Sequence, residues 1–474
     1  MGDYLQDFLK AMRPAFSRQA TFHWFVIVLV GFLVRPDTLG VSSIVRALTL
    51  TPENYAGLLH FFHSTAWSVE GLMTLWWNWL AARQVAYRLG DRLVLVGDHT
   101  KVPKDGRKMP AVTTLHQDSE TGSKPSFFRG HHWGCISLIV QAGDKFLATP
   151  LWANIQEGLA TLTDDDQARQ PKTTRIVSMA QQVARTMGRG AYLVLDAYFA
   201  VGPVFAAAAG VLNGTENLIH ILTRAKKNVV AYRPAPTPKK RKRGPRRKYG
   251  KKVKLMTLFD AKTAAGQFQT AETLVYDRSE RVRYLVLDLL WKPTKSLLRF
   301  ILVESSRGRM ILMSSDLNLD PLQALHLYCR RARIETMFDV LKNTLGALTY
   351  HFWSLYLHPA SRRPKKNDSQ PQCSSQPAIT RRTLAATEKF VNVQLLLLGI
   401  LQLIARAYPQ QVRTTAHCWL RTVSAGRPSE FVTRLALTTL IKTNLYGFAK
   451  DWITRLIRQR QEFTGKRKGY KDVA

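Results

Sequence analysis

The spacing of apolar residues indicates a helical region from residue 1 to about residue 90. Within it, the stretch "GVSSIVRALTLTPENYAGLLHFFHS" predicts two amphipathic helices that meet at a turn. This pattern is compatible with a helix-turn-helix motif, but any two-helix hairpin would show the same spacing. Both interpretations of this pair of helices therefore stay open.

Strand-like and helical patterns alternate over residues 91–227. Three apolar runs predict strands, and Gly143-Asp144 predicts a hairpin between the second and the third. A helix over "KTTRIVSMAQQVARTMG", a strand over "AYLVLDAYFA", a short helix and a strand over "ENLIHILTRAKK" follow. This order predicts an α/β layer arrangement with acidic residues at the ends of two core strands.

A basic loop and a β-rich segment occupy residues 228–317. From Ala231 to Lys254 the chain is rich in proline and then in lysine and arginine, without one acidic residue. Such a stretch is typical of an arm that contacts phosphates and also of a solvated linker. Five β-type runs separated by polar turns, from "KLMTLFD" to "RMILMSS", predict an all-β insertion.

Helical spacing returns at Pro321 and continues to the end of the chain apart from one linker. We assign residues 318–358 to the final helix of the core and the Ser-, Pro-, Gln- and Lys-rich stretch 359–383 to a linker. Residues 384–474 form a helical C-terminal region, whose apolar faces fit either dimerisation or an ordinary core.

The charge of the chain narrows the class of partner. Its 474 residues carry 69 Lys+Arg against 33 Asp+Glu, a formal net charge of +36, with a globular hydrophobic content of 46%. Nucleic acid is the partner that such an excess favours, because each neutralised phosphate releases counterions. An anionic membrane surface or a ribosome-like assembly is the alternative. With nucleic acid as the partner, residues 1–90 are assigned to DNA binding.

Cysteines and apolar runs bear on the compartment. The apolar run Phe25–Val34 is too short to span a bilayer, which takes about 20 apolar residues. The run "VQLLLLGILQLIA" is interrupted by two glutamines, as in a buried core helix. No CxxC spacing or disulfide framework is visible among the cysteines. We expect a soluble cytoplasmic protein, associated with the nucleoid and not with a membrane. The four cysteines are Cys135, Cys329, Cys373 and Cys418.

The stretch "LYCRRARIETMFDVLKN" is a candidate for catalysis. In one helix, at about 100° per residue, Tyr328, Arg331, Glu335 and Lys342 fall at offsets of 0, 3, 7 and 14 and share one stripe. A simple i,i+4 ion pair of Arg331 and Glu335 would add a few tenths of a kcal/mol. Asp339 lies near the same face, one turn after Glu335.

Two more acidic residues are candidates to join Glu335 in one site. Asp98 follows the apolar run "LVLVG", and Asp196 follows "AYLVL". If these strands are neighbours, the two carboxylates lie close together, and a helix packed on the sheet adds Glu335. Three converging carboxylates repel one another unless a cation holds them, and such oxygen ligands suit Mg²⁺, for which Mn²⁺ can substitute. Two such ions support in-line phosphoryl transfer.

The spacing Y-(2)-R-(3)-E-(6)-K, together with two aspartates on strands, resembles the bacterial DDE transposases that carry the YREK signature. The resemblance extends from about residue 90 to residue 345. It implies a ribonuclease H-like core, a mixed sheet flanked by helices, with a β-rich insertion before the glutamate. It also implies hydrolytic nicking at transposon ends, a hairpin intermediate and strand transfer, carried out by a homodimer in a synaptic complex on double-stranded DNA.

The resemblance assigns roles to individual residues. Asp98, Asp196 and Glu335 would be the catalytic, metal-binding triad, with Mg²⁺ as the cofactor. Lys101 and Lys104 are further DNA-contact candidates, because they follow Asp98 on a basic loop. The residues expected to contact DNA are Tyr328, Arg331, Lys342, Arg224, Lys226, Lys101 and Lys104.

One departure from the family pattern concerns the hairpin step. Hairpin-forming relatives stack a flipped base on a tryptophan at the start of the strand before the glutamate helix. Met310 stands at that position here, while Trp291 lies on an earlier strand and could substitute. Two alternatives to an active transposase remain: a nuclease or resolvase on the same fold, and a DNA-binding derivative that has lost catalysis.

Overall fold

The computed structural model covers 474 residues and groups them into two compact units. Each unit is discontinuous in sequence: unit 1 comprises residues 1–85, 99–172 and 336–474, and unit 2 comprises residues 86–98 and 173–335. Strand β2 (Arg92–Pro103) and helix α11 (Arg333–Asp339) each run through a unit boundary. The structure describes all residues except 118–125, 160–161, 163–169, 210, 213–215, 237–246, 361–372, 417–425, 448–450 and 463–474.

The N-terminal part of unit 1 is helical, as predicted. The long apolar helix α2 is buried along most of its length, since twelve of its residues have little solvent exposure. Serines 42 and 43 begin helix α3 without capping it, because its N-cap is Val41 and no side chain bonds there. The elements are α1 (Gly2–Met12), the 3₁₀ helix η1 (Arg13–Ala15), α2 (Gln19–Val34), α3 (Ser42–Ala47), α4 (Asn54–His63) and α5 (Val69–Ala82).

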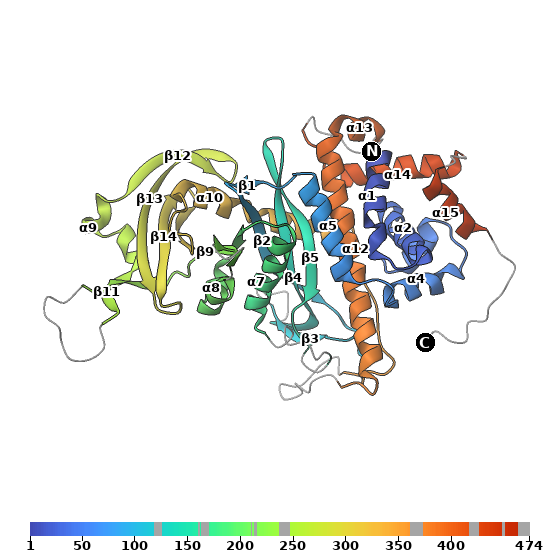
Figure 1. Ribbon diagram of the computed structural model, residues 1–474, viewed down its shortest axis with the longest axis horizontal. Helices are drawn as coiled ribbons and strands as arrows, with labels where there is room; N and C mark the ends of the chain where they lie inside the picture. The colour runs from blue at the N-terminus through green and yellow to red at the C-terminus, as the bar shows by residue number, and fades with distance from the viewer. Residues whose placement is uncertain are drawn as a thin grey trace. The chain divides into compact units, whose positions relative to one another are not determined.

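Helix α12 (Pro377–Ala407) is the long core helix of unit 1 (Figure 1). Its length and composition would allow it to cross a membrane, but 89% of its most apolar window is buried inside the protein. Its polar residues bond strand β5 (Lys145–Ile155): Asn392 Nδ2 donates to the Ala153 carbonyl at 2.8 Å, and Gln402 Oε1 accepts from Thr149 at 2.9 Å. The prediction of a buried core helix is confirmed.

Further strands and helices belong to the described part of unit 1. Strand β5 pairs with β4 (Phe127–Ala142) through the predicted hairpin, where Gly143 adopts a φ of +66° that suits glycine. Strand β3 (Thr113–His116) pairs with the other end of β4. The helices after α12 are α13 (Pro409–Thr415), α14 (Glu430–Tyr446) and α15 (Trp452–Gln461).

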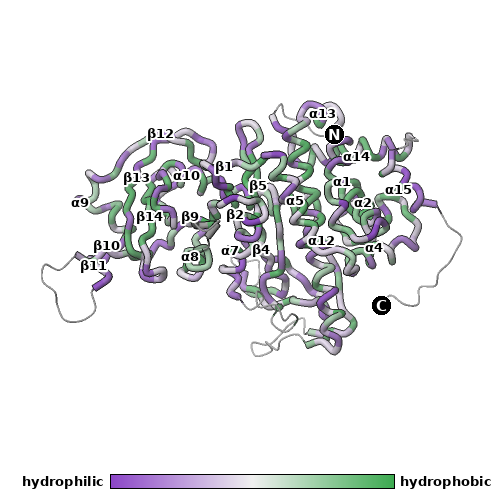
Figure 2. The backbone as a smooth tube through the Cα atoms, in the orientation of Figure 1, coloured by the Kyte–Doolittle hydropathy of each residue, from purple (hydrophilic) through white to green (hydrophobic). Residues whose placement is uncertain are grey.

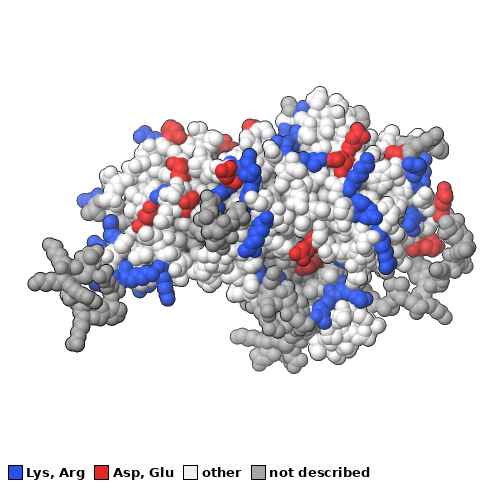
Figure 3. Space-filling view, viewed as in Figure 1, with Lys and Arg blue, Asp and Glu red and all other residues white. Residues whose placement is uncertain are grey.

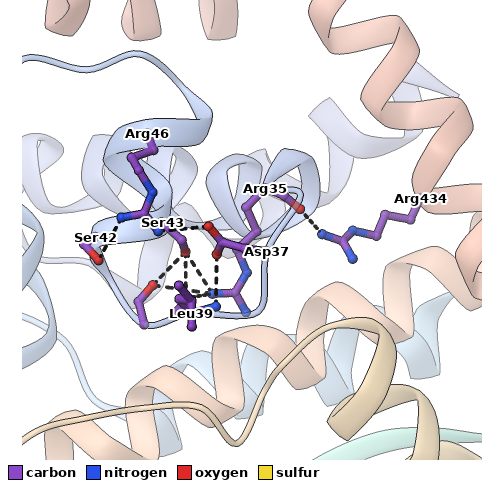
Figure 4. A network of polar contacts seen from close by, with 8 residues as sticks. Arg35, Asp37, Leu39, Ser42, Ser43, Arg46 and Arg434 are labelled. Carbon is purple, nitrogen blue, oxygen red and sulfur yellow. Dashed lines mark hydrogen bonds and ion pairs between the residues drawn. The ribbon is translucent and has the colours of Figure 1, made fainter.

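A buried arginine joins separate parts of unit 1. Arg35, at the C-terminal end of α2, donates to the carbonyls of Leu39 at 2.6 Å and of Leu345 at 2.5 Å and to Gln394 Oε1 at 3.0 Å. Arg434 on α14 donates in turn to the Arg35 carbonyl, as Figure 4 shows. Burial, and then Arg434, lowers the pKa of Arg35 to about 10. The N-terminal and C-terminal helices are thus tied together by cations bonded to carbonyl oxygens.

Unit 2 is built on a mixed sheet with helices packed against it. Strand β2 pairs in parallel with β6 (Ala191–Leu195), and β6 pairs in parallel with β9 (Ile219–Arg224). Helix α10 (Pro321–Arg330) contacts both β6 and β9. The other helices are α7 (Lys172–Thr186), η2 (Ala197–Phe199) and α8 (Gly202–Ala208), and three short strands are β1 (Arg88–Leu89), β7 (Val211–Leu212) and β8 (Glu216–Asn217). This α/β arrangement is consistent with a ribonuclease H-like core.

The β-rich segment continues the same sheet. Strand β15 (Gly308–Ser314) pairs antiparallel with β9, so the strand order within unit 2 is β11-β10-β13-β14-β15-β9-β6-β2. The apolar residues of β13 and β14 give these strands their green colour in Figure 2. The other strands are β10 (Val230–Pro234), β11 (Tyr249–Lys254), β12 (Gln269–Val275), β13 (Arg278–Trp291) and β14 (Ser296–Ser305).

Two predictions for this segment need correction. The run "KLMTLFD" was wrongly assigned to a strand, since Leu255–Phe259 form a 3₁₀ helix (η3) whose Leu255 and Phe259 are buried, and helix α9 (Lys262–Ala265) follows. The ends of the basic stretch are strands and not a loop, because β10 and β11 pair antiparallel. Residues 237–246, the most basic part of that stretch, lie outside the described residues.

Candidate functional site

Asp98 and Asp196 stand at matching positions on two neighbouring strands of unit 2. The parallel pairing of β2 and β6 sets Val96 opposite Val194, and each aspartate lies two residues further along. Because paired strands are about 4.8 Å apart, the two acidic residues reach the same edge of the sheet. Asp196 follows the end of β6, whereas Asp98 lies inside β2, which continues to Pro103.

Arg331 connects Asp98 with Glu335. Its Nη2 donates to Asp98 Oδ2 at 3.0 Å, and its Nη1 donates to Glu335 Oε1 at 2.9 Å. The side chains of Arg331 and Asp98 are 14% and 17% exposed, while that of Glu335 is 62% exposed. One guanidinium therefore bridges a carboxylate of the sheet and a more open carboxylate of α11.

The predicted single helix across this region was wrong. Helix α10 ends at Arg330, α11 begins at Arg333, and a π-helix (Val340–Thr344) follows α11. Between α10 and α11 the backbone forms i,i+3 bonds, such as Arg331 N to Tyr328 O at 3.1 Å. Because Arg331 lies on this turn, it reaches β2 and α11 at once. Sequence periodicity cannot reveal that bend, since it depends on contacts between distant segments.

The electrostatics of the cluster link all three carboxylates. Burial raises the pKa of Asp196; the positive charge of Arg331 opposes this effect, and the negative charge of Glu335 adds to it. Burial lowers the pKa of Arg331, but Asp98, Glu335 and Asp196 outweigh burial and hold it above its usual value. The charges of both the arginine and the glutamate therefore affect the pKa of Asp196.

The donor chemistry of this cluster suits a divalent ion, but its present arrangement is that of an ion-pair network. Among the residues that the structure describes, no three His, Cys, Asp or Glu groups are placed to share a metal ion. Carboxylate oxygens are nevertheless the ligands that Mg²⁺ and Mn²⁺ prefer. Sharing an ion between Asp98 and Glu335 would require Arg331 to release them.

The predicted DNA contacts of unit 2 differ in accessibility. Tyr328 is only 7% exposed, and its burial raises its pKa to about 12. Arg224 ends β9 and is half-buried, whereas Lys226, just after it, is exposed. In Figure 3 the lysines and arginines on the face shown are scattered among uncharged side chains.

The predicted DNA contacts of unit 1 include one buried side chain. Lys104 is buried, and its Nζ donates to the carbonyls of Leu348 at 2.7 Å and Tyr350 at 3.0 Å, so it is not open to a phosphate. Lys101 is partly exposed and donates to the His116 carbonyl at 2.8 Å. Lys342 is exposed on the π-helix after α11.

The exposure of side chains in unit 2 bears on whether a flipped base can stack at Trp291 or Met310. Trp291 is buried, and its ring lies edge-on to Phe205 at 5.5 Å, while Met310 is buried within β15. Neither presents an open surface for a base. Tyr198, two residues after Asp196, is 46% exposed, and its backbone N–H donates to Asp196 Oδ1 at 3.0 Å. Sequence reasoning missed Tyr198, although its place beside Asp196 in "DAYF" was the available signal.

Comparison with known families bears directly on this chain. The family model of the DDE superfamily endonucleases matches residues 11–283, more than half of the chain. The chain belongs to this family. The match contains Asp98 and Asp196 and ends within β13, before Arg331 and Glu335. No curated protein matches the chain.

Membership sets the coarse function of this DDE endonuclease. Proteins of the family act on DNA and generally use divalent metal ions, so the chain has a nuclease- or transposase-type function. The large mixed sheet of unit 2, with helices against it, is consistent with the DDE fold.

Proposed function

We propose that this chain is a DNA transposase of the YREK-signature group, with Asp98, Asp196 and Glu335 as its catalytic triad. The observation that carries the proposal is the bridging of Asp98 and Glu335 by one arginine, with Asp196 at the matching position of the neighbouring parallel strand. The family membership supports DNA as the substrate. The glutamate stands outside the family match, so its role rests on the geometry.

In the proposed reaction the carboxylates of Asp98, Asp196 and Glu335 would hold Mg²⁺, or Mn²⁺ in its place. Such ions would lower the pKa of an attacking water or hydroxyl and would stabilise the charge of the leaving oxygen. Asp98 and Asp196 supply ligands fixed by paired strands, and Glu335 supplies the more exposed ligand from α11. No side chain needs to form a covalent intermediate.

The cationic side chains that are expected to contact DNA position it for the reaction. Arg331, Arg224 and Lys226 belong to unit 2, and Lys342 and Lys101 belong to unit 1. Their role is to hold backbone phosphates, which fixes the register of the scissile bond without reading its sequence. We further propose that two copies of the chain act together on paired transposon ends and that the C-terminal helices contribute to the dimer.

A nuclease that cuts without joining ends is the second candidate. The family description names an endonuclease activity, which needs only the cleavage half of a transposition reaction. Detection of strand transfer into a target plasmid separates the two candidates, because only a transposase joins the freed 3′ end to new DNA.

The test is cleavage of a donor plasmid that carries the terminal repeats flanking the gene, in Mg²⁺. Wild type is compared with Glu335→Gln and with the matched control Asp339→Asn, which removes an exposed acid one turn further along. We expect wild type and the control to cut at the repeats, and Glu335→Gln to bind them but to cut about 100- to 1000-fold more slowly. Equal cutting by all three proteins would refute the assignment of Glu335.

A further inference from the structure

Arg331 bonds two of the three carboxylates that the proposed function assigns to the metal. Each arm of its guanidinium is held by a different carboxylate, Asp98 Oδ2 at 3.0 Å and Glu335 Oε1 at 2.9 Å. The third N–H group, on Nε, is buried and has no partner among the described residues. Arg331 therefore neutralises the carboxylates of Asp98 and Glu335, but its own Nε–H donor has no acceptor among the described residues.

An ion bound to those two oxygens would come close to the position of the guanidinium. Mg²⁺ lies about 2.0–2.1 Å from its oxygen ligands, and a cation at that distance from both carboxylates would strongly repel a guanidinium held by the same oxygens. The contacts with Arg331 and the contacts with a shared divalent ion are thus alternatives.

We propose that Arg331 competes with the divalent ion for Asp98 and Glu335, so that this arginine must leave the carboxylates before they bind the metal. The inference rests on the proposed function, because it takes those carboxylates as metal ligands. Arg331 lies on the turn between α10 and α11, where i,i+3 bonds replace the regular helical ladder.

DNA supplies the alternative partner for the arginine. A phosphate accepts two parallel N–H bonds from a guanidinium, as a carboxylate does. When Arg331 turns to a backbone phosphate, Asp98 and Glu335 become available to the metal. Because coupling between two ligands is reciprocal, DNA then strengthens metal binding and metal strengthens the binding of DNA at this site. The competition therefore makes the DNA-bound enzyme bind the metal more tightly than the free enzyme.

The experiment measures Mn²⁺ binding to the full-length chain without DNA, from the electron paramagnetic resonance signal of free Mn²⁺. The proteins are wild type, Arg331→Ala, Arg331→Lys and the control Arg333→Ala, which removes a neighbouring arginine paired with Asp277. We expect Arg331→Ala to bind Mn²⁺ about 10-fold more tightly than wild type. Arg331→Lys keeps the competing charge and stays close to wild type, as does Arg333→Ala.

The sign of the change separates competition from a structural role. An arginine that merely holds the carboxylates in place would leave the Ala variant with equal or weaker Mn²⁺ binding, and either result overturns the inference. So does a Lys variant that binds as tightly as the Ala variant. Circular dichroism checks folding, and Arg331→Gln replaces Arg331→Ala if the latter does not fold.

One further variant separates this inference from the proposed function. Glu335→Gln must weaken Mn²⁺ binding if Glu335 is a ligand. If it binds Mn²⁺ as wild type does, the metal site and the proposed function fail together. If it weakens binding while Arg331→Ala does not strengthen it, only the competition by Arg331 fails.

Discussion

Arg35 in unit 1 and Arg331 in unit 2 are both largely buried, yet their partners differ in kind. The hydrogen bonds that Arg35 donates go to carbonyl oxygens, Ser43 and Gln394, and burial lowers its pKa to about 10. Arg331 donates to two carboxylates, which hold its pKa above the usual value despite burial. The contrast indicates that Arg35 holds the fold together, whereas Arg331 balances negative charge that the fold does not require.

The largest expected effect on stability tests this contrast. Arg35→Met removes the donor that bonds the Leu345 carbonyl and the Gln394 amide oxygen, and it leaves the Leu39 carbonyl with the Ser43 hydroxyl as its donor. At about 1–3 kcal/mol for each unsatisfied buried group, we expect a loss of about 3–5 kcal/mol in the free energy of unfolding. Arg331→Met should lose about 1–2 kcal/mol, because Glu335 is exposed to solvent. Denaturant titrations measure both, and equal losses would contradict the contrast.

The next effect concerns the second arginine of the same network. Arg434 donates to the carbonyls of Leu33 at 2.9 Å and Thr344 at 2.5 Å and to that of Arg35. Arg434→Met should cost about 2–3 kcal/mol by the same reasoning. Combined with Arg35→Met, it should show a coupling of at least about 0.5 kcal/mol in a double-mutant cycle, since the two arginines share one network. Simple additivity would show that they act separately.

The buried lysine Lys104 predicts how the stability of the protein depends on pH. Burial lowers the pKa of Lys104 to about 8 from its ordinary value of 10.5. Between pH 8 and 10.5 the unfolded chain keeps a proton that the folded chain has lost, so stability rises with pH in this range. Between pH 7.5 and 9.5 we expect a gain of about 2 kcal/mol from this group. Lys104→Met should flatten the rise, and an unchanged pH profile of unfolding would show that Lys104 remains charged.

The smallest effect belongs to an exposed ion pair beside Arg35. Arg46 and Asp37 form a contact at 2.9 Å near the surface, and both appear in Figure 4. Arg46→Ala should change the free energy of unfolding by less than about 1 kcal/mol, as exposed pairs do. A loss of unfolding free energy as large as that of Arg35→Met would mean that the Arg46–Asp37 pair stabilises the fold together with the buried bonds of Arg35.

The sequence predicted the parts of the site that local pattern controls. Apolar runs before Asp98 and Asp196 and a helical segment bearing Glu335 were visible as short motifs. The parallel pairing of β2 and β6 agrees with the prediction of neighbouring strands, although β2 continues past Asp98 to Pro103. The turn at Arg331 was not visible, because no glycine or proline marks it and it depends on a contact with β2. Burial of Lys104 was missed for the same reason, since its acceptors lie more than 240 positions later in the chain.

Iron-directed cleavage of the polypeptide tests most directly whether these carboxylates form a metal centre. Fe²⁺ is bound in place of Mg²⁺ in the presence of terminal-repeat DNA, ascorbate and peroxide are added, and the broken peptide bonds are mapped by mass spectrometry. The account predicts cuts next to Asp98, Asp196 and Arg331–Glu335, suppressed by excess Mg²⁺ and absent in Glu335→Gln. Cuts concentrated elsewhere, for example around the His132–Glu157 pair, with none near the three carboxylates, would contradict it.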